Sequence, residues 1–455
     1  MSMKCSQRWH SNEPGWRTLA VIVLAVAVVG LHFVQLYSPL RLNTDACRLL
    51  NMAVSAAEGR GFLVHGQRDY LPIGYPAAVL LLMNLGAGAT FWLNALNLGA
   101  LLAGSGLLFL MTACLENIRN APGLRLLLCI LPLAAWVSIK HVSVPLTESL
   151  YTAVSMASAA ALVACWESRR TTPMMTWLAV GIVLAWYAMM VRTVGVSLFG
   201  ASALTLALHP QMRHLAMRFC PRSARDWWRL AGASIACLAL ALVVALRFAS
   251  PSIVMPSNGY LREQLDALQG GIGRFIANIL SMRLQEAGEV FLNVPSSKFA
   301  RLGLAFDLVG GVAVAVCALG WWRLRRVLPP LAFYVAFYWA IIFVWPFYDV
   351  RFWMPLLPAL GLCVWLAVQP LLRMKWLYFS ALTYLCVFLG LGFAALFFSV
   401  RISLAPPRKF AEIYGDGSYR ASYSVAFGAE ETGSSAVNTD VVDLLRRFDA
   451  RARTR

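Results

Sequence analysis

Long apolar runs separated by short polar segments extend along almost the whole sequence. A helix needs about 20 predominantly apolar residues to cross the hydrocarbon core of a bilayer. The pattern therefore predicts an all-α polytopic membrane protein with about 11–12 transmembrane helices. The runs occupy residues 17–37, 89–112, 125–139, 146–165, 174–191, 194–208, 229–247, 303–320, 328–345, 352–369 and 376–399.

Residues 72–86 leave the number of spans open. The segment has 15 residues and begins with the sequence Pro-Ile-Gly-Tyr-Pro. It is short for a membrane span, and irregular backbone is tolerated at membrane depth where it is buried in protein. We expect either a short span or a re-entrant segment here.

Composition and charge support the membrane assignment and exclude other classes of protein. The chain of 455 residues is 60% hydrophobic and 13% charged, with a mean hydropathy of +0.66, which excludes a soluble domain. The net charge of +18 does not indicate nucleic-acid binding, because the basic residues cluster in short loops between apolar runs. Such loops are retained in the cytoplasm. They occupy residues 113–124, 166–173, 209–228, 321–327 and 370–375.

This charge distribution places the N-terminus inside and predicts how the chain is divided. Residues 1–16 form a cytoplasmic segment, and residues 17–399 form the transmembrane domain. The longer external loops of that domain are 38–72 and 248–302, and residues 400–455 form an external tail. The sequence shows no internal repeat and no separate soluble catalytic domain.

Two further helices are expected outside the membrane. In the second external loop, apolar residues at helical spacing predict a helix that lies on the bilayer. These residues are Ile272, Phe275, Ile276 and Ile279. Near the end of the tail, a similar stripe predicts a short basic amphipathic helix. It consists of Val441, Leu444, Leu445 and Phe448.

Asp45 lies just outside the first apolar run, in the sequence Asn-Thr-Asp-Ala-Cys. A carboxylate at the edge of the bilayer is costly unless it is solvated, paired or used, which makes Asp45 a functional candidate. A structural alternative stays open at this point. Thr44 or Asp45 is a suitable N-cap for a helix over residues 46–57.

The topology places many other ionisable residues on the same external face. The set contains Arg48, Glu58, His65, Arg68, Asp69, Tyr70, Lys140, His141, Glu148, Arg192, Tyr348, Asp349 and Arg351. Structural alternatives exist for the three most prominent members. Glu148 is suited to cap its helix, Arg192 to form a buried ion pair, and Arg351 to pair with Asp349. The ten cysteines and six histidines show no metal-site spacing.

Several short motifs occur in an order that resembles a known family. The chain has Asp45 after the first apolar run, a Gly-x-Gly turn at 59–61 and the sequence Tyr-Leu-Pro-Ile-Gly-Tyr-Pro at 70–76. Pro-Leu-Thr-Glu at 145–148, the break Val-Arg-Thr-Val-Gly at 191–195 and Arg-Phe-Trp-Met-Pro-Leu-Leu-Pro at 351–358 follow. In these motifs the chain resembles the GT-C membrane glycosyltransferases. It is similar to dolichyl-phosphate-mannose:protein mannosyltransferases and to the lipid A aminoarabinose transferase.

The resemblance implies transfer of a sugar from a polyprenyl-phosphate-linked donor to a lipid, glycan or protein acceptor. A general base is needed for the acceptor hydroxyl, and Asp45 is the catalytic candidate. Cations are needed where charge develops on the leaving phosphate. The predicted substrate-binding residues are Arg68, Asp69, Tyr70, Lys140, Glu148, Arg192, Tyr348 and Arg351. The resemblance places such a protein in the bacterial inner membrane, with its active face outside.

Two departures from the family pattern affect these expectations. Many members have a second acid directly after the first-loop Asp, whereas this chain has Ala46. No metal ligand is therefore assigned, and participation of a divalent metal is left open. The soluble domain that some members carry after the last helix is reduced here to residues 400–455.

A transporter or flippase of a lipid-linked or anionic substrate is the alternative from another functional class. Transporters favour broken helices, inverted repeats and charges near the middle of the bilayer. In this sequence the polar groups gather at one membrane face instead. A polymerase or ligase of surface glycans is chemically close to the glycosyltransferase interpretation.

Overall fold

A computed structural model describes residues 15–212, 271–345, 347–414, 417–428 and 437–453 of the chain. The described part is almost entirely helical, apart from the short antiparallel strands β1 (Leu63–Val64) and β2 (Gln67–Arg68). The predicted all-α polytopic architecture is therefore confirmed. The expected span 229–247, the external residues 248–270 and most of the N-terminal segment lie outside the described residues.

Seven helical segments in the described part are long and apolar enough to cross a membrane. They are α1 (Gly15–Gln35), α4 (Thr90–Thr112), α8 (Thr147–Glu167), α9 (Thr171–Val191), α15 (Gly303–Val327), η5 with α17 (Val350–Leu356 and Leu357–Val368) and α18 (Lys375–Ser403). Shorter apolar helices pack among them. They are α3 (Gly74–Asn84), α6 (Pro122–Ala134), η2 with α10 (Thr193–Gly195 and Val196–Leu208) and α16 (Pro329–Ile342).

The span expected over residues 125–139 is divided into two helices. The first is α6, and the second is the short helix α7 (Trp136–His141). Pro132 lies in the last turn of α6, and Ala135 adopts an extended conformation between the two helices. Pro132 weakens this turn, because proline removes a backbone donor. At the break itself, Asn293 donates to Ala134 O at 3.0 Å and accepts from Trp136 N at 2.6 Å, so its side chain takes the place of helical partners there.

The segment 72–86 forms α3, which has 11 residues. At 1.5 Å per residue its length is about 16 Å, well short of the roughly 30 Å hydrocarbon core. A single helix of this length does not span the bilayer. Gly74 at its start packs against α9, where a Cβ atom would come within 2.6 Å of the backbone carbonyl carbon of Met190. The glycine of this motif therefore permits close contact between α3 and α9.

The expected helix of the second external loop is present as α14 (Ile272–Leu292). It packs closely against α15, and both helices present glycine at the contact. A Cβ on Gly310 would lie 1.8 Å from the carbonyl oxygen of Leu284, and one on Gly288 would lie 2.1 Å from that of Phe306. Small residues of this kind allow helix backbones to approach each other in membrane proteins. The C-terminal half of α14 is buried in the protein, which the apolar stripe of this helix did not predict.

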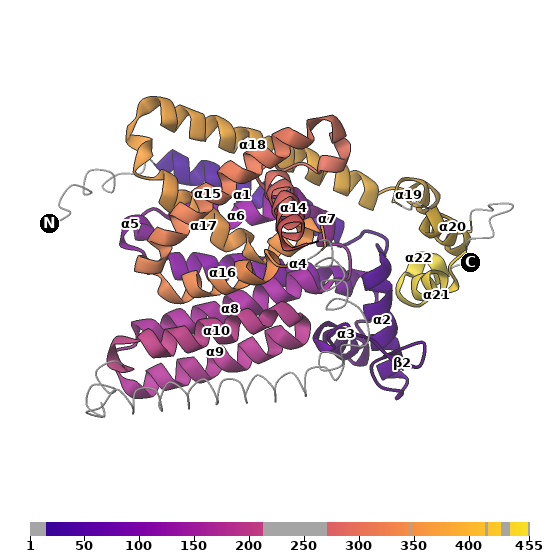
Figure 1. Cartoon of the computed structure of the whole chain (residues 1–455). Helices are drawn as coiled ribbons and strands as arrows, with labels where there is room; N and C mark the ends of the chain where they lie inside the picture. Colours follow the sequence, from indigo (N-terminus) through magenta and orange to yellow (C-terminus); the bar gives the residue numbers. More distant parts are fainter. Residues whose placement is uncertain (1–14, 213–270, 346, 415–416, 429–436, 454–455) are drawn as a thin grey trace.

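Several elements outside the long helices lie at one end of the bundle (Figure 1). They are α2 (Thr44–Ala57), the β1–β2 hairpin, and the helices of the C-terminal tail. The tail consists of α19 (Pro407–Tyr414), α20 (Gly417–Ala426), α21 (Thr439–Phe448) and α22 (Ala450–Arg453). The predicted amphipathic helix of the tail is confirmed as α21. Its apolar stripe is buried in the protein, against α20 and α2.

Candidate active site

The first loop presents Asp45 in the first turn of α2. The N-cap of this helix is Asn43, whose side-chain oxygen accepts a hydrogen bond from Ala46 N at 2.8 Å. The expected cap at Thr44 or Asp45 is therefore wrong, because the residue before them takes this role. The carboxylate of Asp45 instead contacts a side chain from a distant segment. Arg351 Nη2 lies 2.6 Å from Asp45 Oδ2.

Arg351 lies at the start of η5, where Asp349 is the N-cap and accepts a hydrogen bond from Arg351 N at 3.1 Å. The same two residues also form the side-chain ion pair that was the structural alternative for Arg351. The guanidinium reaches a third carboxylate, because Arg351 Nε lies 3.5 Å from Glu148 Oε1. One arginine therefore connects carboxylates from three separate segments.

Glu148 and Arg192 form the buried side of the same arrangement. Arg192 Nη1 donates to Glu148 Oε1 at 3.0 Å, and the two side chains are 12% and 3% exposed. Arg192 has an extended backbone between α9 and η2. Gly195 permits this break, because a Cβ there would meet the backbone of Met189 at 2.4 Å. The ion pair expected as the alternative for Arg192 is present, and Glu148 makes no capping bond in α8.

We refer to these side chains as the ion cluster. It consists of Asp45, Glu148, Arg192, Asp349 and Arg351. Three carboxylates and two guanidinium groups give a formal charge of −1 when all are ionised. Asp45 and Asp349 are 27% and 28% exposed, so the cluster is open to solvent on their side and closed around Glu148.

The surroundings of the ion cluster affect the protonation of two neighbouring groups. Burial raises the pKa of Asp349, and the Arg351 guanidinium opposes this effect. Burial, together with the positive charges of Lys140, Arg351 and Arg192, lowers the pKa of His141 well below its usual value. His141 is therefore neutral beside the cluster at neutral pH, and it adds no cation.

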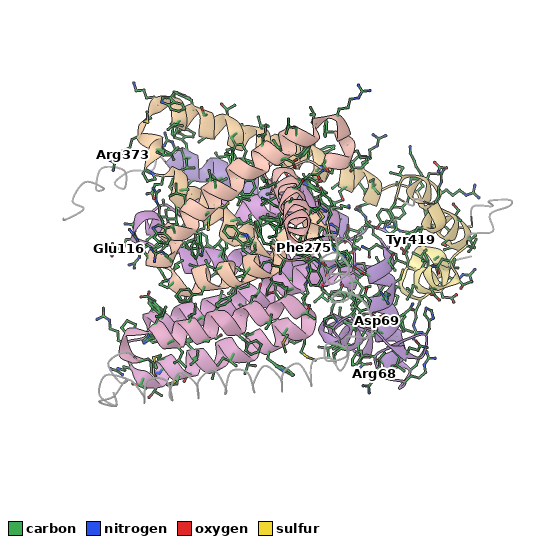
Figure 2. All side chains as sticks on the ribbon, in the orientation of Figure 1. Arg68, Asp69, Glu116, Phe275, Arg373 and Tyr419 are labelled. Atoms are coloured by element: carbon green, nitrogen blue, oxygen red, sulfur yellow. The ribbon has the colours of Figure 1, made fainter. Side chains whose placement is uncertain are left out.

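Three of the predicted substrate-binding residues lie at the hairpin. Arg48 binds two of them, with Nε 2.8 Å from Asp69 Oδ2 and Nη1 2.7 Å from the hydroxyl of Tyr70. Arg68 is exposed on β2. Figure 2 shows Arg68 and Asp69 at the outer end of the molecule, beside α2. The part of these three residues in substrate binding stays a prediction.

Lys140 and Tyr348 also make their contacts outside the ion cluster. The Lys140 ammonium lies 5.8 Å from the centre of the Trp136 ring and is exposed. Tyr348 donates its hydroxyl hydrogen bond to Glu289 of α14 and lies 3.2 Å from Ser296 Oγ. Their roles in substrate binding likewise stay predictions.

A second buried ionic group, on α14, was missed from the sequence. Arg283 and Glu286 are fully buried and form an ion pair at 2.6 Å. Glu286 also accepts hydrogen bonds from Asp349 N at 2.7 Å and from Trp353 Nε1 at 2.8 Å. The pair therefore binds the backbone of Asp349 and the side chain of Trp353, on either side of Arg351, to α14. Charges three residues apart on one helical face were the available signal, because such residues are neighbours on a helix.

Within the described residues, no group of three or more His, Cys, Asp or Glu side chains is arranged to hold a metal ion. The carboxylates of the ion cluster are connected through the two arginines instead. The arrangement is suited to proton transfer at Asp45 and to binding an anion through the guanidinium groups.

Comparison with known proteins gives a likeness in fold. No protein-family model and no curated protein sequence matches the chain. Two crystal structures of ArnT from Cupriavidus metallidurans are similar to it, each with 12% sequence identity. For the structure bound to undecaprenyl phosphate, the TM-score is 0.52, and the similar region covers 97% of this chain and 88% of the ArnT chain. The apo structure has a TM-score of 0.51, with coverages of 95% and 84%. The chain therefore shares its overall membrane fold with ArnT, as the sequence resemblance implied.

Proposed function

We propose that this protein is a membrane glycosyltransferase that moves a sugar from a polyprenyl-phosphate-linked donor to an acceptor hydroxyl. The observation that carries the proposal is the ion cluster, in which the first-loop carboxylate of Asp45 contacts Arg351, and Glu148 lies between Arg351 and Arg192. Its occurrence in a fold shared with ArnT, which has been crystallised with undecaprenyl phosphate, supports a lipid-phosphate donor. We further propose that the reaction takes place at the external face of the bacterial inner membrane.

In the proposed reaction, Asp45 is the general base. The acceptor oxygen attacks the anomeric carbon of the sugar while the bond from that carbon to the phosphate oxygen breaks. The acceptor proton passes to the Asp45 carboxylate, and the polyprenyl phosphate leaves with the bonding electrons. The solvent-accessible side of the ion cluster supports this role, because the acceptor needs to come within hydrogen-bond distance of Asp45.

Arg192 and Arg351 are proposed to bind the lipid phosphate. Each guanidinium has five N–H donors, and Arg192 uses one of them for Glu148 in the described contacts. Donors fixed in place before the reaction stabilise the charge that develops on the leaving group. The cluster already carries one excess negative charge. Phosphate binding therefore favours the protonated form of Asp349, whose pKa is raised by burial.

Mass spectrometry of cells tests the proposed function even while the sugar and the acceptor are unidentified. Glycans and lipids are compared between cells that have the gene, cells that lack it, and cells that carry Asp45→Asn. We expect one glycan or lipid species to lose the mass of a sugar residue in both altered strains. Identical profiles in all three would contradict the proposal. If cells that lack the gene fail to move the donor across the membrane but keep the transfer chemistry, the result would support a flippase instead.

A further inference from the structure

The C-terminal tail makes a dense set of contacts with the loop that precedes Asp45. We call residues 36–43, between α1 and α2, the α1–α2 loop. Asp449 Oδ2 accepts a hydrogen bond from Leu40 N at 2.9 Å. The hydroxyl of Tyr423 donates to Leu40 O at 2.6 Å and accepts from Leu42 N at 2.8 Å. These bonds join residues that are about 400 positions apart in the sequence.

The burial of these groups makes the tail essential to the loop conformation. Leu40, Leu42, Tyr423 and Asp449 are each at most 4% exposed, so water does not replace the tail as a hydrogen-bond partner. Buried backbone N–H and C=O groups require partners, and leaving them unpaired is unfavourable. The backbone of the α1–α2 loop therefore takes the conformation that Tyr423 and Asp449 can bind.

Arg41 holds the same loop on the transmembrane side. It is buried, and its guanidinium donates to Ser399 Oγ and Ser399 O, both at 3.1 Å, and to Ser403 Oγ at 2.8 Å. These acceptors lie near the C-terminal end of α18, where the partial negative charge of a helix C-terminus favours a cation. The loop is thus bound by α18 on one side and by the tail on the other.

The tail also contacts α2 at both ends. At its start, Thr44 Oγ1 lies 3.2 Å from the hydroxyl of Tyr419. At its end, Arg447 Nη1 lies 2.7 Å from a carboxylate oxygen of Glu58. Asp45 lies directly after Thr44 in the first turn of this helix. Its position relative to Arg351 is therefore determined by the tail-bound loop and by a helix that the tail holds at both ends.

We propose that the C-terminal tail is part of the framework of the active site, and that Tyr423 and Asp449 are positioning residues for Asp45. This inference rests on the proposed function, because it assigns their effect to the base of that reaction. In the described structure, Tyr423 and Asp449 contact the α1–α2 loop, and Tyr419 contacts Thr44 beside Asp45. Loss of the contacts that Tyr423 and Asp449 make with the α1–α2 loop should therefore lower the rate of transfer. It should leave donor binding at Arg192 unchanged.

Two variants of the full-length protein in nanodiscs test the proposal. Tyr423→Phe keeps the packing of the ring against Phe410 and Phe427 but removes the hydroxyl. Asp449→Ala removes the acceptor for Leu40 N. The matched control is Tyr384→Phe, which removes a hydroxyl that donates to a backbone carbonyl, Phe291 O at 2.8 Å, outside the loop. Hydrogen–deuterium exchange of the loop amides is measured together with kcat and the donor KM.

We expect both variants to exchange the amides of Leu40 and Leu42 faster than wild type. We also expect kcat to fall by about 10- to 100-fold, since misplacement of a catalytic group by about 1 Å has effects of this order. The donor KM should change much less than kcat, because the contact of Arg192 with Glu148 lies away from the tail, and only Arg351 of the two proposed phosphate ligands is paired with Asp45. Tyr384→Phe should match wild type in loop exchange and in turnover.

The outcomes separate this inference from the proposed function. Unchanged exchange at Leu40 and Leu42 in both variants would overturn the inference, as would wild-type kcat beside faster exchange. An inactive Asp45→Asn beside a fully active Tyr423→Phe would refute the positioning role alone. A fully active Asp45→Asn would show that Asp45 is not the general base. The positioning role of Tyr423 and Asp449 would then be refuted together with that part of the proposed function.

Discussion

Replacement of Arg192 by alanine separates two roles that this side chain can have. Arg192 is an ion-pair partner of Glu148, and it is also the proposed phosphate ligand. The Glu148 side chain is only 3% exposed, so Arg192→Ala leaves a buried carboxylate without the partner at 3.0 Å. Removal of one partner of a buried pair destabilises a protein by about 3–5 kcal/mol, and the lower end of this range applies here because Glu148 keeps Arg351 Nε at 3.5 Å. We therefore expect a clear loss of thermal stability from this substitution.

The double variant Arg192→Ala/Glu148→Gln removes both charges and should recover most of that stability. Paired substitutions of this kind measure the coupling between two residues. The phosphate contact is different, because removing Glu148 does not replace it. A hydrogen bond to a charged group contributes about 1.5–3 kcal/mol, which corresponds to about 10- to 150-fold in kcat/KM for the donor. We expect the double variant to be stable and still impaired in kcat/KM.

Melting temperature in detergent and donor kinetics in nanodiscs are the two measurements. Arg192→Lys is the matched control, because lysine keeps the charge but loses the paired donors of the guanidinium. It should retain part of the activity. Recovery of activity together with stability in the double variant, at unchanged donor affinity, would show that Arg192 is a structural partner of Glu148 and would refute the phosphate assignment.

Three further predictions follow from the ion cluster and from α14. Asp45→Asn should remain folded and inserted but lose about 10²–10⁴-fold in kcat, the usual contribution of a general base, and wild-type turnover would contradict this. A cysteine at position 45 in intact cells should react with a membrane-impermeant thiol reagent from outside, and labelling only from the cytoplasmic side would refute the external active face. Burial raises the pKa of Glu286 from 4.5 to about 7, so the folded state binds its proton more tightly than the unfolded state. The contribution of this protonation to stability is therefore present below about pH 4.5 and is lost as the pH rises towards 7. The melting temperature of Glu286→Gln should depend less on pH over this range than that of wild type. Parallel plots of melting temperature against pH for the two proteins would contradict the assignment.

The helical architecture was predictable from the sequence because a bilayer imposes a length on its spans. The expected run 376–399 lies within α18, and the expected run 146–165 lies within α8 apart from its first residue. The division between α6 and α7 was not predicted. Hydropathy registers only an apolar run there, whereas Asn293, more than 150 residues away, binds the backbone on both sides of Ala135.

The members of the ion cluster were predictable because each is a charge beside an apolar run, where an unpaired charge is costly. Their pairing was only partly predictable. Asn43, Thr44 and Asp45 are all good N-caps, and the sequence alone does not choose among them. The structure makes Asn43 the cap, which leaves the carboxylate of Asp45 available to Arg351.

The long-range supports of the site were not predictable in this way. Arg283 and Glu286 follow an apolar stripe that dominated the interpretation of α14, and their partners lie more than 60 residues away. The contacts of Tyr423 with the α1–α2 loop bridge about 380 residues. Such contacts depend on how the bundle brings the two ends of the chain together, and no local pattern encodes that arrangement.

Release of the lipid product by purified protein is the decisive measurement for the proposed transfer reaction. Proteoliposomes are supplied with the polyprenyl-phosphate-sugar fraction and the acceptor lipids and glycans of the source cells, and free polyprenyl phosphate is quantified by mass spectrometry. We predict that wild-type protein releases polyprenyl phosphate in step with the appearance of a glycosylated acceptor, and that Asp45→Asn releases almost none. Equal release by the two proteins, or an intact donor after incubation with wild-type protein, would contradict the proposed reaction.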